Sequence, residues 1–256
     1  MTAQPDEQTL RYDLMIAHHL THYYKMDELV WNHISARCPS PTTPSTADSP
    51  PPSYLITPGR KTFNMLRPEN FNLCVPSENI TSDVIHSSIY AARQDVNAIV
   101  HLHTPGATAI GCLKDGYRPI SQDGAHFFNR VAVHPWEGIS DDLEEGERLK
   151  TNVCSPSDAC ILMMPNHGFS AMGSSIAEAW VLAYYFEKSC MNLLNAYSTG
   201  QPINFPDDDV MNHAKEQSLD PMFRAGNQEW GGLKEMMEDT DREKYADYTS
   251  GQRSNY

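Results

Sequence analysis

The sequence predicts a single α/β domain whose strands and helices alternate irregularly. The chain has 256 residues, which is long enough for one sizeable core, and it shows no internal repeat. Short apolar runs typical of strands alternate with segments of helical periodicity, without the regular rhythm of a doubly wound parallel sheet. The sequence contains neither a Gly-x-Gly-x-x-Gly nor a Walker loop. We expect one domain over residues 8–245, followed by a disordered tail at 246–256.

The first third of the chain contains signals for two helices, a loop and a strand. Residues 8–26 carry apolar side chains at helical spacing. Residues 38–53 are so rich in proline, serine and threonine that we expect a surface loop insertion. An apolar run at 54–57 predicts a strand, and residues 82–93 predict a helix capped by its first or second residue.

The rest of the chain continues the mixture of strands and helices. The expected elements are a strand at 97–100, a helix at 105–113, a strand at 131–133, a helix at 141–151, a strand at 159–164 and a helix at 174–196. The last helix is the most strongly indicated, because Ser174 or Ser175 can cap it and Glu178 lies in its first turn. The segment after Gly200 is polar and contains one amphipathic patch around Trp230.

Composition excludes several classes of partner and compartment. A net charge of −14 is unsuited to nucleic acid, whose phosphates it would repel. No apolar run is long enough to span a bilayer, and the N-terminal residues do not have the pattern of a signal peptide. The six cysteines are scattered and form no Cys-x-x-Cys pair. We therefore expect a cytoplasmic protein that binds neither nucleic acid nor membrane.

Two histidines at the end of a predicted strand are the clearest candidates for a chemical site. His101 and His103 follow the apolar run at 97–100, and side chains two residues apart on a strand point to the same face. Both imidazoles can then reach one metal ion, although such a pair is more often structural. His167 follows the apolar run at 159–164 and precedes Gly168. A third histidine at the end of a second strand shifts the balance towards a metal at the rim of a sheet.

The residues around these histidines form a longer pattern. Residues 86–106 contain His-x-x-x-Tyr-x-x-Arg-x-Asp-Val, a short apolar strand and then His-x-His-Thr. Residues 165–168 read Pro-Asn-His-Gly, and a glycine and a Glu-Ala pair follow at 173–179. With Asn-His-Ile-Ser at 32–35, this pattern closely resembles the class II aldolase/adducin family, and the adducin-like branch is nearest. The resemblance extends in order over about residues 10–245.

The resemblance implies a fold, an assembly and a metal site. The fold would be a three-layer α/β/α class II aldolase-like arrangement with a central, mostly antiparallel sheet. The subunits would form a homo-oligomer, usually a tetramer, with sites near the subunit interfaces. By position, His101, His103 and His167 would bind one divalent metal ion per subunit, Fe(II) or Zn(II). Such a site leaves coordination positions open for a substrate.

Three departures from the family pattern bear on the substrate and the chemistry. Ser82 occupies the position of the acid/base carboxylate of the aldolases; the neighbouring Asp83 could replace that carboxylate or could instead cap the helix. The phosphate-binding pairs of the sugar-phosphate members are replaced by Asn32-His33, Gly59-Arg60 and Ile80-Thr81, which argues against a phosphosugar. Arg60 could grip a carboxylate instead.

The third departure concerns the proton donor. His134 falls near the tyrosine that donates a proton in the aldolases, and it could do acid/base work or simply be a satisfied turn residue. His33 and His86 lie in family motifs near the expected pocket, where substrate contact and packing are equally plausible roles.

Three functions follow from these observations. The sequence slightly favours an Fe(II)- and O2-dependent oxidative decarboxylation of a small carboxylate-bearing metabolite in biosynthesis, because that chemistry needs neither the lost carboxylate nor the phosphate pocket. The first alternative is a zinc-dependent aldolase or lyase. The second alternative is a non-catalytic adducin-like binding module, since the fold alone does not establish an activity.

Overall fold

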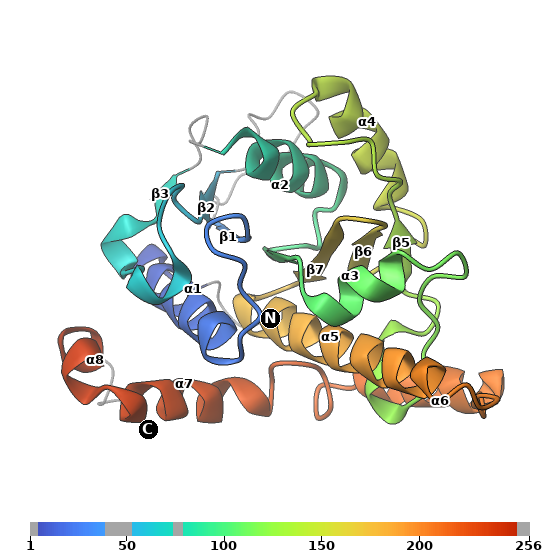
Figure 1. The fold of residues 1–256 in the computed structure, drawn as a ribbon. Helices are drawn as coiled ribbons and strands as arrows, with labels where there is room; N and C mark the ends of the chain where they lie inside the picture. Colours follow the sequence, from blue (N-terminus) through green and yellow to red (C-terminus); the bar gives the residue numbers. More distant parts are fainter. Residues whose placement is uncertain (1–4, 39–52, 74–78, 250–256) are drawn as a thin grey trace.

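The computed structural model describes residues 5–38, 53–73 and 79–249. Among these residues, a sheet of seven strands runs in the order β3-β2-β1-β4-β7-β6-β5. Figure 1 shows this sheet with helices packed around it. The strands are β1 (His33–Arg37), β2 (Tyr54–Ile56), β3 (Asn72–Leu73), β4 (Ala98–Leu102), β5 (Val131–Val133), β6 (Ile161–Met164) and β7 (Gly168–Gly173). Neighbouring strands are antiparallel except for β5 and β6, which are parallel. The prediction of a mostly antiparallel sheet is confirmed.

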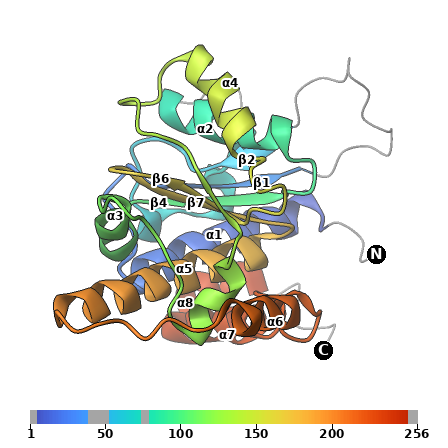
Figure 2. The same ribbon diagram turned by 90° about the vertical axis from the view of Figure 1, so that its right-hand side faces the viewer.

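Helices cover both faces of the sheet. The helices are α1 (Glu7–Tyr23), α2 (Ile80–Ala92), α3 (Pro105–Gly111), α4 (Leu143–Asn152), α5 (Ile176–Ser198), α6 (Asp208–Leu219), α7 (Glu229–Thr240) and α8 (Arg242–Thr249). Figure 2 shows α2 and α4 on one face and α1 and α5 on the other, with the C-terminal helices beyond α5. The three-layer α/β/α prediction is therefore confirmed. No helix in the described part of the chain is long and apolar enough to cross a membrane.

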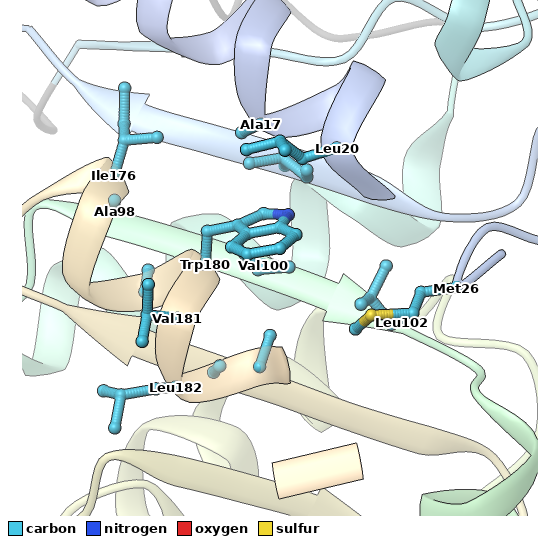
Figure 3. Packing of buried hydrophobic residues seen from close by; sticks show 14 of the residues in the cluster. Ala17, Leu20, Met26, Ala98, Val100, Leu102, Ile176, Trp180, Val181 and Leu182 are labelled. Carbon is cyan, nitrogen blue, oxygen red and sulfur yellow. The ribbon is translucent and has the colours of Figure 1, made fainter. Parts of the chain in front are cut away.

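The alternation of side chains along the central strand divides the core into two clusters. Val100 and Leu102 of β4 pack with α1 and α5, where Trp180 is buried among them (Figure 3). Ile99 points to the opposite face and packs with α2 and α4. His101 follows Ile99 by two residues, so its side chain lies on the α2 and α4 face. The alternation of side chains along β4 thus determines on which face of the sheet the histidine side chains lie.

The register of the sheet gathers several strand ends at one edge, here called the histidine edge. His33 at the start of β1 is paired with His101 near the end of β4. Gly168 at the start of β7 is paired with Met164 at the end of β6. The loops that leave the sheet at these points are consequently neighbours, although they are distant in sequence.

The structure corrects the predicted start of α2. The helix begins at Ile80 and its N-cap is Asn79, so neither Ser82 nor Asp83 caps it. Ser82 is buried, and its hydroxyl donates a hydrogen bond to the carbonyl oxygen of Asn79. Asp83 lies within the first turn. The capping prediction is wrong because the helical backbone starts earlier than the apolar period indicated.

The C-terminal region contains more helix than the sequence predicted. α6 was not anticipated, and α8 continues to Thr249, so the tail expected from residue 246 starts inside a helix. Tyr245 anchors α8, since its ring is buried and its hydroxyl bonds to Nδ1 of His19 at 2.5 Å. The rest of that tail and nearly all of the loop predicted at 38–53 lie outside the described residues.

Candidate metal centre

The three histidines selected from the sequence lie together at the histidine edge. One nitrogen from each of His101, His103 and His167 can be chosen so that all lie within 4.8 Å of one another. The Nε2 atoms of His101 and His103 are 3.0 Å apart. The ring centre of His167 lies 5.0 Å from that of His101 and 4.7 Å from that of His103. The two motifs therefore converge on one point.

The turn between β6 and β7 places His167 against β4. Asn166 has a positive φ of 63°, a left-handed conformation that asparagine tolerates better than most residues. Gly168 lies so close to β4 that a Cβ atom there would come within 2.4 Å of the Leu102 carbonyl oxygen and 2.8 Å of a ring carbon of His103. The Asn-His-Gly sequence is therefore required by the tight turn and by the close contact of the two strands.

Outer partners orient two of the imidazoles. Nδ1 of His101 lies 3.0 Å from the Ser170 hydroxyl, and Nδ1 of His103 lies 2.7 Å from a carboxylate oxygen of Glu28. With both Nδ1 atoms engaged outward, the Nε2 atoms are directed towards each other. A histidine that donates its other N–H to an outer acceptor is the usual arrangement of a metal ligand.

A third support fixes the start of the helix that follows His103. The Glu187 carboxylate accepts hydrogen bonds from the backbone N–H groups of Gly106 and Ala107, at 2.9 and 2.8 Å. It also accepts a hydrogen bond from the Thr104 hydroxyl. A carboxylate at a helix N-terminus satisfies otherwise unpaired donors. Sequence reasoning missed both Glu28 and Glu187, because neither lies in a motif that contains a histidine.

Burial keeps His101 and His167 in the neutral form that can bind a metal. Desolvation lowers the pKa of His101 well below 6.5 and lowers that of His167 to about 4. Neutral imidazoles have a lone pair free for coordination. Nδ1 of His167 is buried and has no hydrogen-bond partner among the described residues. An unpaired buried nitrogen beside two convergent imidazoles fits a divalent ion such as zinc.

His33 and His86 lie directly behind this centre. The ring of His33 stacks on that of His101, with centres 4.5 Å apart and planes inclined by 13°. Nδ1 of His33 lies 2.6 Å from Nε2 of His86. Burial lowers the pKa of His33 well below 6.5 and that of His86 to about 3, so both rings are neutral. Both residues were predicted to contact substrate. His33 lies against His101 of the candidate metal centre, and His86 lies behind His33.

His134 is held by its own neighbours. The Asn152 side chain donates to Nδ1 of His134 at 2.9 Å, and Nε2 lies 3.3 Å from the Glu145 carboxylate. The ring is fully buried. Both ring nitrogens are therefore engaged with α4. This agrees with the second of the two roles considered from the sequence, a turn residue whose hydrogen bonds are satisfied. Its acid/base role stays a prediction.

The remaining predicted residues lie around the histidine edge. Asp83 and Ser82 precede His86 on α2, at the end of the helix that is nearest His33. Arg60 is exposed and has a φ of 66°, in the turn that follows β2. Because β2 is antiparallel to β1, this turn leaves the sheet at the same edge as His33.

A cavity in the described part of the chain lies away from the histidine edge. It has a volume of about 350 Å³ and is lined by Arg37, Asn97, Ser175 and Arg224, among others. Arg37 and Asn97 are at the ends of β1 and β4 opposite to the histidines. Among the described residues, the group of side chains that could hold a metal ion lies at the histidine edge and does not line this cavity.

Comparison with known proteins gives a consistent picture. A family model described as Class II Aldolase and Adducin N-terminal domain matches residues 13–194. An aldolase II superfamily protein from Pseudomonas syringae has a similar structure, with a TM-score of 0.79, 29% identity and coverage of 93% of this chain and 95% of that one. An L-fuculose 1-phosphate aldolase from Glaciozyma antarctica shares the fold, with a TM-score of 0.76, 19% identity and coverage of 93% and 92%.

A much longer protein, which is not named as an aldolase, is also similar in sequence. Alpha-adducin from Rattus norvegicus is 29% identical over 215 residues, which cover 77% of this chain and 27% of the adducin. The similarity thus extends both to proteins named as aldolases and to a much longer protein of another kind.

Proposed function

Because the chain belongs to the class II aldolase and adducin family, we propose that it is a zinc-dependent lyase that breaks a carbon–carbon bond in a small carboxylate-bearing metabolite. The observation that carries this proposal is the convergence of His101, His103 and His167, with Glu28 and Ser170 behind two of the rings. A site built only to hold the fold together would not need three imidazoles whose ring nitrogens converge on one point.

The three histidines would hold the ion and leave positions open for the substrate. A bound zinc ion would polarise a carbonyl oxygen of the substrate and stabilise the negative charge that develops when the adjacent bond breaks. The side chains around it then have to bind the rest of the substrate, orient it and move a proton.

Arg60 is the proposed anchor for the substrate carboxylate. It lies at the histidine edge and is exposed, and a guanidinium can bind a carboxylate through two parallel hydrogen bonds. An anchored carboxylate would fix the orientation of the bond that breaks.

Asp83 is the preferred candidate for proton transfer. It lies in the first turn of α2, which begins at the histidine edge. His134 is the alternative, with both ring nitrogens bonded to Asn152 and Glu145 of α4. A carboxylate in the first turn of a helix that begins at the histidine edge can both accept and donate a proton there.

We also propose that subunits associate around the histidine edge. Leu29, Trp31, Trp136 and Ile139 are all exposed. Leu29 and Trp31 lie in the loop before β1, and Trp136 and Ile139 lie in the loop after β5. Both loops leave the sheet at the histidine edge, and large exposed apolar side chains along one edge are typical of a surface that another subunit covers.

The zinc lyase is preferred to the iron-dependent oxidative decarboxylase that the sequence slightly favoured. The structural relatives include a named aldolase, and no relative described above is named for oxygen chemistry. A non-catalytic role is the second candidate, and the similarity to alpha-adducin is the observation that favours it.

Turnover by protein loaded with a single metal tests these functions. Zinc-loaded and anaerobically iron-loaded protein would each be offered a panel of 2-hydroxy and 2-oxo acids, while carbonyl products and oxygen uptake are measured. We expect cleavage by the zinc form without oxygen uptake. Oxygen consumption by the iron form, with an inert zinc form, would establish the oxidative alternative. Metal binding without turnover would favour the binding module.

The carboxylate anchor has its own test. Arg60→Ala should raise KM at least about tenfold with a smaller change in kcat, because a charge-assisted hydrogen bond to the substrate is lost. The control is Arg242→Ala on α8, where the arginine is exposed and pairs only with Asp239 among the described residues. An unchanged KM in Arg60→Ala would remove Arg60 from the site.

A further inference from the structure

A chain of hydrogen bonds leads from the metal centre into the core. Nδ1 of His33 faces Nε2 of His86 at 2.6 Å, and Nδ1 of His86 faces the Ser35 hydroxyl at 2.5 Å. The Ser35 hydroxyl then lies 2.8 Å from the Tyr90 hydroxyl. All four side chains are at most 2% exposed. We call this series of His33, His86, Ser35 and Tyr90 the histidine relay.

The spacing of two sequence motifs produces the relay. His33 and Ser35 are two residues apart on β1, a rise of about 6.6 Å along one face of a strand. His86 and Tyr90 are four residues apart on α2, a rise of about 6 Å along one face of a helix. The two side chains on the strand are therefore spaced like the two side chains on the helix, so each can meet its partner. The Asn-His-Ile-Ser and His-x-x-x-Tyr motifs thus form one structural unit.

The far end of the relay determines which atoms carry protons. Tyr90 is fully buried, and the only acceptor for its hydroxyl among the described residues is Ser35. Its O–H must donate to Ser35, because an unpaired buried phenol would lose its hydration without compensation. Ser35 then has its own proton to give, and it donates to Nδ1 of His86.

The proton positions on His86 and His33 follow from the same hydrogen bonds. His86, neutral and accepting at Nδ1, carries its proton on Nε2 and donates to Nδ1 of His33. His33, also neutral, must then carry its proton on Nε2. That nitrogen makes no hydrogen bond with a described residue, and its ring stacks on the metal-ligand candidate His101.

The reverse direction would have a different consequence. If His33 donated to His86, the Nε2 atom of His33 would have a free lone pair and could be a fourth metal ligand. The geometry argues against that direction as well. The group of convergent ligand atoms contains His101, His103 and His167 but not His33.

We propose that His33 is a hydrogen-bond donor to the substrate at the metal centre, with its Nε2–H fixed by the histidine relay. This inference rests on the proposed metal-dependent function. His33 would donate to a substrate oxygen as negative charge develops on it, which supplements the metal. His86, Ser35 and Tyr90 are positioning residues that hold the donor tautomer. The site would thus favour substrates with two adjacent oxygen atoms, one directed to the metal and one to His33.

The tautomer can be observed without metal, substrate or activity. In protein labelled with 15N-histidine, long-range 1H–15N spectra distinguish a protonated ring nitrogen from one with a lone pair, and His33→Gln identifies the His33 signals. We expect a protonated Nε2 on His33 in the metal-free and zinc-loaded forms. Ser35→Ala should shift this signal towards an average of both tautomers. Tyr90→Phe should shift it in the same direction but by less, since Ser35 is then free either to donate to His86 or to accept from it. An unprotonated Nε2 in the wild-type protein would overturn the proposal.

Binding of acetohydroxamate to cobalt-loaded protein tests the donor role. This probe chelates metals through two adjacent oxygens, and the visible spectrum of Co(II) reports its binding. His33→Phe should retain the metal content of the wild type but bind the probe about 10- to 100-fold more weakly. His33→Gln, which keeps an N–H donor, should restore binding to within about threefold.

The outcomes separate this inference from the proposed function. Loss of cobalt in His33→Phe would make His33 a ligand and overturn the donor role. Wild-type affinity for the probe in His33→Phe would overturn it as well. If the wild-type protein binds no metal, the proposed function fails, but the tautomer measured on metal-free protein still decides the direction of the relay.

Discussion

At the scale of single residues, His103 depends on a side chain that lies 75 positions earlier in the chain. Glu28 accepts the hydrogen bond from Nδ1 of His103, and the Asn32 side chain holds the loop by accepting from the backbone N–H of Glu28 at 2.5 Å. The carboxylate fixes the orientation of the ring and leaves Nε2 as the nitrogen that can bind a metal. The metal centre is therefore defined by its supporting acceptors as well as by its histidines.

Removal of this acceptor should weaken metal binding. For Glu28→Ala we expect about a tenfold loss of zinc affinity, measured by competition with a chromophoric chelator. The matched control is Glu216→Ala, at an exposed position on α6, which should bind zinc like the wild type. Equal affinity in both variants would show that Glu28 does not support the centre.

The sequence could predict the histidines but not their partners. His101 and His103 alternate with the apolar residues of one strand, so local periodicity is enough to place them on one face. Glu28 lies in an irregular loop, where no period links it to His103. The capping role predicted for Ser82 or Asp83 was wrong, because a helix start shifts by a few residues without changing the apolar pattern.

At the scale of elements, the approach of β7 to β4 determines where His167 lies. The two strands pair along their length, from Ala98 with Gly173 to Leu102 with Phe169. Gly168 lies just beyond this pairing, where the backbone of β4 leaves no room for a side chain. Glycine is therefore required at this position by the space between elements.

A methyl group at this position should disturb both fold and site. For Gly168→Ala we expect a loss of about 1–3 kcal/mol in the free energy of unfolding, together with weaker zinc binding, because the β6–β7 turn must move away from β4. Urea denaturation and chelator competition measure the two effects. Gly231→Ala is the control, since a Cβ there meets nothing within 4 Å and the residue lies in α7. Wild-type behaviour of Gly168→Ala would contradict the close contact.

One helix that the sequence missed, α6, has little apolar surface. In α6 only Met211 and Ser218 are buried, so no apolar stripe marks the helix. α5, in contrast, buries an apolar face under the sheet and was predicted nearly to its ends. A helix that buries few apolar side chains leaves a weak period in the sequence, and its formation depends on tertiary structure.

At the scale of the whole molecule, buried neutral histidines should make the fold sensitive to acid. Burial lowers the pKa of His18 to about 3 and that of His19 to about 4. His18 lies between the carbonyl oxygen of Leu14 and the hydroxyl of Thr57, an arrangement that suits the neutral ring. In the unfolded chain these histidines have a pKa near 6.5.

The sign of the pH effect follows from these values. Below about pH 6.5 the unfolded chain binds protons that the folded protein does not, so acid favours unfolding until about pH 4 for His19 and about pH 3 for His18. Within this range each histidine lowers the free energy of unfolding by up to about 1.4 kcal/mol per pH unit of acidification. Well above pH 6.5 the free energy of unfolding does not change with pH on account of these two residues.

Urea unfolding at several pH values measures this effect. We expect a free energy of unfolding that falls steeply between pH 6 and 5, with net uptake of at least about two protons. His213→Gln, at an exposed position on α6, should give the same curve. A flat curve between pH 6.5 and 5 would show that His18 and His19 are protonated in the folded protein.

The metal content of the purified protein tests the central claim most directly. Wild-type, His101→Ala and His213→Ala proteins would be purified in parallel, exposed to limiting zinc, separated from free metal and measured by mass spectrometry. We expect one zinc ion per subunit in the wild type and in His213→Ala, and almost none in His101→Ala. Equal zinc in His101→Ala and the wild type would contradict the assignment of the site to the histidine edge.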